Sequence, residues 1–342
     1  MAINTTETTE PKTDKKPNNP HDRFARKTLG NPLYAADFLK HYVDPIVAQY
    51  VHLDRLVAAP THYLSDELKE VILDVAFTAH LHDEAGGSEV LMFLEHKSKP
   101  SLFVPLQVGA HCFFSLYFGW TATGYLETYQ PSIPLMFLIY NGNEEIDEEM
   151  FFQDIFKEIP KPLQRYIPQF EIFVINLKRF FYGKLPGKPE TKAIAESFKR
   201  ATDGTFTDHL DEILKQIKDA NLNKQQTLDL TTSITRYCTW TNHITSEEIV
   251  QSITKVFNGT EGLEMATTIK KGILQEGFEN GFENGELKGL VKGILYLLND
   301  KFGQVPQDIV DSLNQRTDEI ALKSLLIHAA NCSSLDEFVA DL

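Results

Sequence analysis

The sequence predicts a mixed α/β domain followed by helical C-terminal parts, and three observations lead to this fold class. Apolar residues follow a helical spacing over 21–50 and then form two runs typical of β-strands, at 71–81 and 89–95. An apolar helical stretch and two more strand-like runs come next, which is an order typical of α/β folds. After residue 200 the pattern is helical throughout.

The N-terminal part of the domain is expected to contain a hairpin. Residues 1–20 are polar, with almost no large apolar side chain, and are expected to form a disordered tail. Residues 21–200 carry the mixed pattern. Within them the two strand-like runs flank a polar segment, 82–88, whose Gly-Gly pair tolerates positive φ, so we expect an antiparallel hairpin.

The rest of the domain supplies a covering helix and two more strands. We expect a helix over 104–118 and buried strands over 133–140 and 170–176. A helical extension, 201–262, follows, with amphipathic stretches at 208–220, 224–240 and 246–257.

A glycine repeat occupies much of 263–298, where glycine recurs every fourth residue from Gly277 to Gly293. Acidic residues fill its first half and lysines its second, an order that suits a helix dipole. The repeat is either a helix whose glycine stripe admits a partner helix, and so supports a homodimer, or a flexible spacer. Residues 299–342 are expected to form a small helical domain.

Composition excludes several classes of protein. The 342 residues are 42% hydrophobic and 11% aromatic, which is enough for a substantial core and excludes wholesale disorder. A net charge of −15 argues against a protein that coats nucleic acid, although the basic segment 157–200 holds ten Lys/Arg against four acids and is the candidate for phosphate contact. No run of about eighteen apolar residues and no signal peptide are found, so a cytoplasmic protein without a membrane partner is expected.

The predicted hairpin carries residues that could perform chemistry. Asp74 interrupts an apolar strand, and Glu95 and Lys97 follow another, where alternation places both on one face. A hairpin symmetric about residue 84.5 sets Asp74 opposite Glu95, with Cβ atoms roughly 5 Å apart. Two carboxylates this close favour a divalent cation such as Mg²⁺ or Mn²⁺. A salt bridge at a solvated strand end is the alternative interpretation.

At these residues the sequence resembles the PD-(D/E)XK nuclease superfamily, and more closely its Rpn/YhgA-like branch of recombination-promoting nucleases, also described as putative transposases. The resemblance covers roughly residues 21–200. Many members carry Gln at the third catalytic position, whereas Lys97 here restores the general superfamily pattern. The matching residues are His21-Asp22-x-Phe24, Asn31-Pro32, Phe38-Leu39, Asp74, Glu95-His96-Lys97-Ser98, Gln107, Pro134-Leu135 and Tyr140-Asn141-Gly142.

The resemblance implies a PD-(D/E)XK nuclease-like mixed sheet flanked by helices and a Mg²⁺-dependent endonuclease that cleaves DNA. It makes Asp74 and Glu95 metal ligands together with the main-chain carbonyl of His96. It makes Lys97 the catalytic base or water-positioning group and places Gln107 near the metal or the DNA backbone. Asp22 is a further acid that could approach the metal.

Two other functions fit the same sequence. One is a non-catalytic DNA-binding or protein-interaction module on a nuclease fold, and the other is an RNA-cleaving toxin or defence effector. The nuclease itself is expected to act in recombination or in the processing of mobile-element or phage DNA. Strand transfer by a three-carboxylate transposase core is the least favoured, because Glu-x-Lys does not belong to that core.

Overall fold

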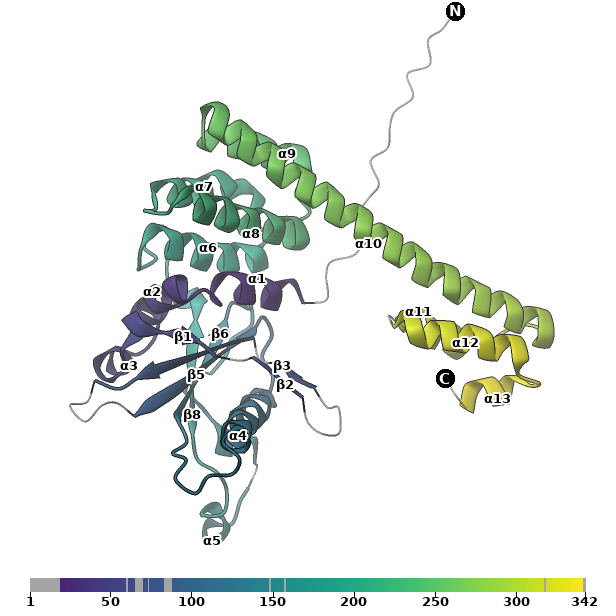
Figure 1. Cartoon of the computed structure of the whole chain (residues 1–342), viewed down its shortest axis with the longest axis horizontal. Helices are drawn as coiled ribbons and strands as arrows, with labels where there is room; N and C mark the ends of the chain where they lie inside the picture. Colours follow the sequence, from purple (N-terminus) through teal and green to yellow (C-terminus); the bar gives the residue numbers. More distant parts are fainter. Residues whose placement is uncertain are drawn as a thin grey trace, which may run out of the picture. The chain divides into compact units, whose positions relative to one another are not determined.

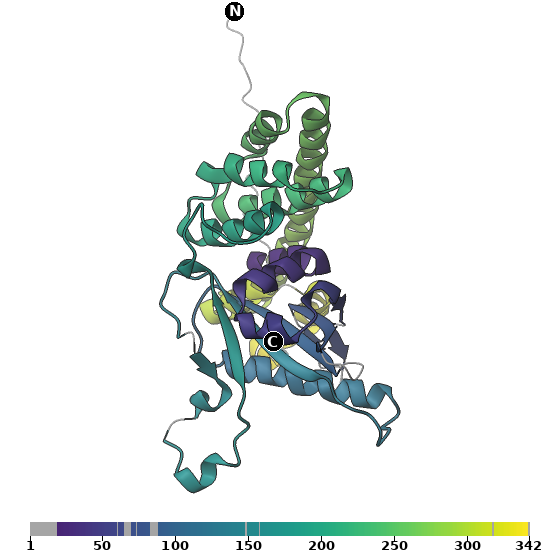
Figure 2. The same ribbon diagram turned by 90° about the vertical axis from the view of Figure 1, so that its left-hand side faces the viewer.

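The computed structural model describes residues 19–59, 61–64, 70–72, 74–82, 88–147, 149–156, 158–316 and 318–340 (Figures 1 and 2). Two compact units are present, a large one at Lys16–Lys270 and a second one made mainly of Lys271–Leu342. In the described part of the chain, no helix combines the length and apolar character needed to cross a membrane.

Short helices open the large unit, as the spacing over 21–50 predicts. Asn31 and Asp44 start two of them, because each side chain accepts a hydrogen bond from a main-chain N–H of the first turn and a proline follows at the first helical position. The elements are α1 (Pro20–Thr28), α2 (Pro32–Tyr42), α3 (Pro45–Tyr50) and the 3₁₀ turn η1 (Leu53–Arg55).

A six-stranded mixed sheet follows, in the order β1-β4-β5-β6-β8-β7. The central pairs β5–β6 and β6–β8 are parallel, whereas β4–β5, β1–β4 and β7–β8 are antiparallel. This mixed sheet with flanking helices confirms the predicted fold class. The strands are β1 (Val57–Ala58), β4 (Val75–His80), β5 (Glu89–Lys97), β6 (Ile133–Tyr140), β7 (Glu149–Phe151) and β8 (Glu171–Asn176).

The β4–β5 pair has the register expected from the sequence. Val75 lies opposite Leu94 and Ala76 opposite Phe93, so Asp74 precedes β4 at the level of Glu95. The tip of the expected turn, 83–87, lies outside the described residues.

The expectation of one continuous strand over 71–81 is wrong. Its first part is β3 (Glu70–Ile72), which pairs with β2 (His62–Leu64) in a separate two-stranded sheet, and Asp74 lies in the break before β4. The physical reason is the carboxylate itself: Asp74 Oδ2 accepts the main-chain N–H of His96, in place of a carbonyl of a paired strand.

Helices cover both faces of the sheet, and α4 (Val104–Ala122) and α1 lie on opposite sides of it (Figures 1 and 2). Val104, Val108 and Cys112 of α4 pack on sheet residues such as Phe93 and Leu138. Side chains alternate along β5, so Glu95 and Lys97 point to the same face as Phe93, toward α4. His96 points to the other face.

A helical stack continues the large unit and packs against α1 (Figure 1). Phe24 of α1 stacks on Tyr237 with ring centroids 4.1 Å apart, and Phe198 and Phe206 complete this aromatic core. The helices of the stack are α6 (Pro189–Asp203), α7 (Leu210–Asp219), α8 (Lys224–Asn242) and α9 (Ser246–Val256), with the 3₁₀ turn η4 (Thr207–His209). The short elements η2 (Phe152–Ile155), α5 (Lys161–Gln164) and η3 (Leu177–Arg179) precede the stack along the chain.

The glycine repeat lies within one helix, α10 (Gly259–Phe302), which begins in the large unit and continues into the second. Of the two alternatives left by the sequence, the structure therefore has the helix. Its C-terminal part packs with three short helices around Leu298, Leu313 and Phe338. These are α11 (Gln307–Gln315), α12 (Glu319–Asn331) and α13 (Leu335–Ala340).

Candidate active site

Glu95 lies near the end of β5 and is the centre of a small polar cluster. Its Oε1 accepts hydrogen bonds from Lys97 Nζ at 2.7 Å and from Gln107 Nε2 of α4 at 2.8 Å. His111 Nδ1, one helical turn after Gln107, lies 3.9 Å from the other oxygen, Oε2. Glu95 and Lys97 thus share a face as the strand alternation predicts, and Gln107 joins them.

Asp74 approaches the same strand from the break before β4. Its Oδ2 accepts the main-chain N–H of His96 at 3.0 Å, and Arg26 of α1 lies 3.4 Å from Oδ1. The structure therefore brings together all the residues that the sequence selects, namely Asp74, Glu95, His96, Lys97 and Gln107. Their chemical roles stay predictions.

Both carboxylates are buried, and their protonation is coupled. Burial and the negative charge of Asp74 raise the pKa of Glu95 to about 7, although Lys97 lowers it. Burial and the charge of Asp22 likewise raise the pKa of Asp74, against the main-chain N–H of His96, its ring and Arg26. Burial and neighbouring negative charge thus outweigh the nearby cations Lys97 and Arg26, so each acid resists ionisation.

Behind the strand, the His96 ring sits in a network that the sequence did not predict. Only 2% of this residue is exposed, and its Nε2 lies 2.9 Å from Asn141 Oδ1. Asn141 Nδ2 donates to the Phe198 carbonyl at 2.8 Å, so its oxygen is left to accept from His96. Asp22 Oδ1 lies 3.4 Å from Nδ1 of the same ring. These contacts hold the end of β5, where the main-chain carbonyl of His96 is the predicted metal ligand.

His21 and Tyr237 extend the network toward α8. The His21 ring stacks on His96 at 5.3 Å, and its Nδ1 lies 2.5 Å from the Tyr237 hydroxyl. Asp22 is buried, accepts a hydrogen bond from Asn19 and contacts the ring of His96, so α1 brings a third acid near the two predicted ligands. The Asp-x-Phe motif at the start of α1 was the only sequence signal for it.

A divalent cation fits the donor set at this site. Within the described ranges, no three His, Cys, Asp or Glu side chains form a metal-binding group, and the side-chain ligands expected from the sequence are the two carboxylates. Asp74 and Glu95 supply carboxylate oxygens, and the main-chain carbonyl of His96 supplies a neutral one, as hard cations prefer. The raised pKa values indicate a pair of acids that a cation would stabilise in its ionised form.

The basic segment 157–200 divides into two kinds of residue. Lys199 and Arg200 are buried: Lys199 Nζ donates to the carbonyls of Leu177 and Phe180, and Arg200 pairs with Glu196 at 3.0 Å. These two cations are structural, so the candidate phosphate contacts of the segment lie among its other cations. Among the described residues of this segment, the exposed cations are Lys161, Arg165, Lys178, Arg179, Lys184 and Lys188.

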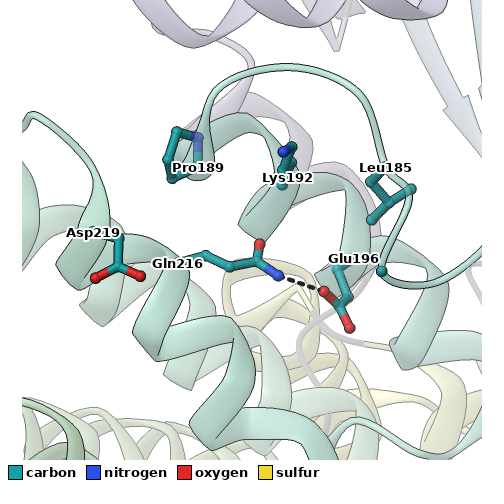
Figure 3. Close-up of a pocket in the computed structure, with 7 residues that line it drawn as sticks. Leu185, Pro189, Lys192, Glu196, Gln216 and Asp219 are labelled. Carbon is teal, nitrogen blue, oxygen red and sulfur yellow. Dashed lines mark hydrogen bonds between the residues drawn. The ribbon is translucent and has the colours of Figure 1, made fainter.

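A pocket of about 280 Å³ lies between α6, α7 and the residues that precede α6 (Figure 3). Its lining residues are not those of the Glu95 cluster. Gln216 Nε2 donates to Glu196 Oε2 at 2.7 Å in its wall, and Arg200 binds the other oxygen of Glu196. The pocket contains none of the predicted site residues. Its walls are formed by Gly183, Leu185, Pro189, Lys192, Glu196, Gln216 and Asp219.

Replacing Gln107 with leucine is expected to lower the activity of the site while leaving the fold intact. Gln107 is exposed on α4, so its loss removes one hydrogen bond to Glu95 without opening the core. Partners that orient a metal ligand are typically worth about 10- to 100-fold in activity. Cleavage assays on Gln107→Leu should show a decrease in this range with an unchanged melting temperature. Gln130→Leu, at another exposed glutamine, is the matched control, and equal rates in the two variants would contradict the assigned role.

Comparison with known proteins gives one match. A family model described as "Putative transposase, YhgA-like" matches residues 19–258, which is more than two thirds of the chain and contains every residue of the cluster. No curated protein and no solved structure matches the chain significantly.

Proposed function

Because the chain belongs to the YhgA-like putative transposase family, we propose that it is a metal-dependent DNA endonuclease that acts in recombination or in the processing of mobile-element DNA. The reaction is hydrolysis of a phosphodiester bond, with Mg²⁺ or Mn²⁺ as the cofactor.

One observation carries this proposal, the buried pair Asp74 and Glu95 with Lys97 beside it. Two buried acids whose pKa values are raised, Glu95 by burial and Asp74 and Asp74 by burial and Asp22, are unfavourable for stability, and a salt bridge at a strand end does not require them. Lys97 beside Glu95 and Arg26 beside Asp74 offset only part of this cost, because both pKa values stay raised. Such an arrangement is typical of functional sites, where stability is sacrificed for chemistry.

The residues of the cluster have distinct roles in the proposed reaction. Asp74, Glu95 and the His96 carbonyl would hold the cation, which polarises the phosphodiester and makes a bound water more acidic. Lys97 Nζ, held 2.7 Å from Glu95, is placed to position the attacking water and to neutralise charge that grows on the phosphate oxygens. Gln107 keeps Glu95 in place from α4.

DNA is the substrate that the family supports, and exposed cations of the basic segment offer phosphate contacts outside the cluster. An overall charge of −15 means that these contacts must be local, so binding should weaken steeply as salt is added.

Plasmid nicking in the presence and absence of Mg²⁺ or Mn²⁺ tests the proposal, with single-stranded DNA and RNA as parallel substrates. We expect cleavage of DNA that stops when the metal is chelated. A second readout is the melting temperature, which either ion should raise in the wild type because it binds the folded acid pair. Preferential cleavage of RNA, or DNA cleavage that is insensitive to chelation, would refute the assignment.

A further inference from the structure

One side of α4 exposes a row of large apolar side chains, with two helical turns between the first two of them. Leu106, Phe113, Tyr117 and Trp120 recur at intervals of seven, four and three residues, so they share one side of the helix. Tyr125 and Leu126 extend the row beyond the C-terminus of the helix, and all six side chains are exposed. We call these six residues the α4 strip.

The far end of the α4 strip is ordered by local contacts. Trp120 Nε1 donates to the Leu126 carbonyl at 3.3 Å, and the Trp120 and Tyr125 rings meet edge to face at 5.1 Å. Tyr125 adopts φ of 63°, directly after Gly124 at 71°. A bulky residue rarely takes this left-handed conformation, and here it holds an aromatic ring on an exposed surface. Preordered Trp and Tyr side chains are characteristic of the energetic centres of protein interfaces.

Charge decides what kind of partner this surface fits. Residues 100–132 contain a single charged side chain, Glu127, in a chain that is 24% charged and carries −15 overall. A phosphate backbone needs Lys or Arg, which this stretch lacks. A second copy of the chain is repelled by most of the acidic surface, but it meets no like charge here except Glu127. An uncharged apolar row is also complementary to itself, which is the requirement of a two-fold interface.

We propose that the α4 strip is the contact surface of a homodimer in which two copies pack their α4 helices together. The inference does not depend on the endonuclease proposal. It has one consequence for it, because Gln107 and His111 extend from the same helix to Glu95. A dimer formed through α4 would hold two acid pairs at a fixed separation.

Sedimentation velocity of the full chain over a wide concentration range measures the self-association. We expect a dimer whose affinity stays constant or rises with salt, because the interface is uncharged and salt screens the repulsion between the two acidic chains. An affinity that falls with salt, or a monomer at every concentration, would overturn the proposal.

Charge substitutions locate the interface. Tyr117→Glu and Leu126→Glu, at residues 51% and 56% exposed, place like charges on both copies and should each weaken the dimer about tenfold or more. Two controls are Phe181→Glu, at an apolar residue 78% exposed elsewhere in the large unit, and Tyr296→Glu, 73% exposed on α10 near the glycine repeat. Both controls should dimerise as the wild type does. Dissociation caused by Tyr296→Glu alone would instead assign the interface to the glycine-repeat helix.

Folding of the variants is checked by circular dichroism and melting temperature. Both α4 substitutions lie on solvent-facing positions, so the monomeric variants should melt as a single folded species. Should one variant fail to fold, the other and the salt dependence of the wild type still decide the outcome.

Discussion

Substituting Glu95→Gln or Asp74→Asn should lower metal-dependent DNA cleavage by about a thousandfold or more, the scale on which removal of a key electrostatic group slows an enzyme. Each change keeps the shape of the side chain and removes one negative charge from the pair that would hold the cation. Initial rates of plasmid nicking at saturating Mg²⁺ measure the effect. Both variants should also lose the rise in melting temperature that metal produces in the wild type.

Glu171→Gln supplies a matched control, because this glutamate is exposed at the start of β8 and belongs to no part of the cluster. Its cleavage rate should equal that of the wild type. Cleavage by Glu95→Gln at the rate of the control would show that the nicking activity has another origin, and the metal site would then have to be abandoned.

Local sequence patterns were sufficient to predict the hairpin that carries the site. A hairpin symmetric about residue 84.5 predicts the register of the two apolar runs, and Val75 indeed lies opposite Leu94. This register sets Asp74 at the level of Glu95. A one-residue slip would have placed the two acids on opposite faces. The alternation along β5 likewise predicted that Lys97 would share a face with Glu95, as the 2.7 Å contact shows.

Contacts between residues that are distant in the sequence could not be predicted from local sequence patterns. Asn141 is 45 residues from His96, and nothing in the spacing of either residue indicates that they form a hydrogen bond. The break before β4 at Asp74 was not predicted for a related reason. An apolar run that contains one acid does not indicate that this acid accepts a hydrogen bond from the main-chain N–H of His96. Burial of Lys199 depends in the same way on carbonyls about 20 residues earlier in the chain.

The sequence also did not predict which aromatic residues of α4 are exposed. The segment 104–118 predicted a helix that covers the sheet, which α4 confirms through Val104 and Val108. Its apolar and aromatic side chains are spread around the helix, so the sequence did not indicate that Tyr117 and Phe113 face solvent. A helix with apolar residues on all sides is typical of a buried helix. The structure is therefore needed to distinguish the face that packs on the sheet from the face that is exposed to solvent.

The metal-free protein should become more stable as the pH falls from about 8 to about 5, and Glu95 should account for much of this gain. Its pKa is raised to about 7 in the folded protein by burial and by the charge of Asp74. The folded state therefore binds the proton more tightly than the unfolded chain does. The stabilisation is fully present below the unfolded pKa, near 4.5, and is lost as the pH rises through about 7. Asp74, whose pKa is also raised, acts in the same direction.

Glu95→Gln isolates this contribution, because it removes the ionisation and keeps the side-chain volume. Well above pH 7 the variant should unfold with a free energy about 3–4 kcal/mol larger than that of the wild type, given about 1.4 kcal/mol for each tenfold change in proton affinity. The difference should shrink as the pH falls from 7 and approach zero only below about pH 4.5, where the carboxyl is protonated in both the folded and the unfolded chain. Urea unfolding in the presence of a chelator at several pH values measures it, and Glu171→Gln again serves as the control. A Glu95→Gln variant less stable than the wild type at pH 8 would show that the ionised Glu95 stabilises the fold through its ion pair with Lys97. A structural salt bridge would then replace the metal site as the explanation of the cluster.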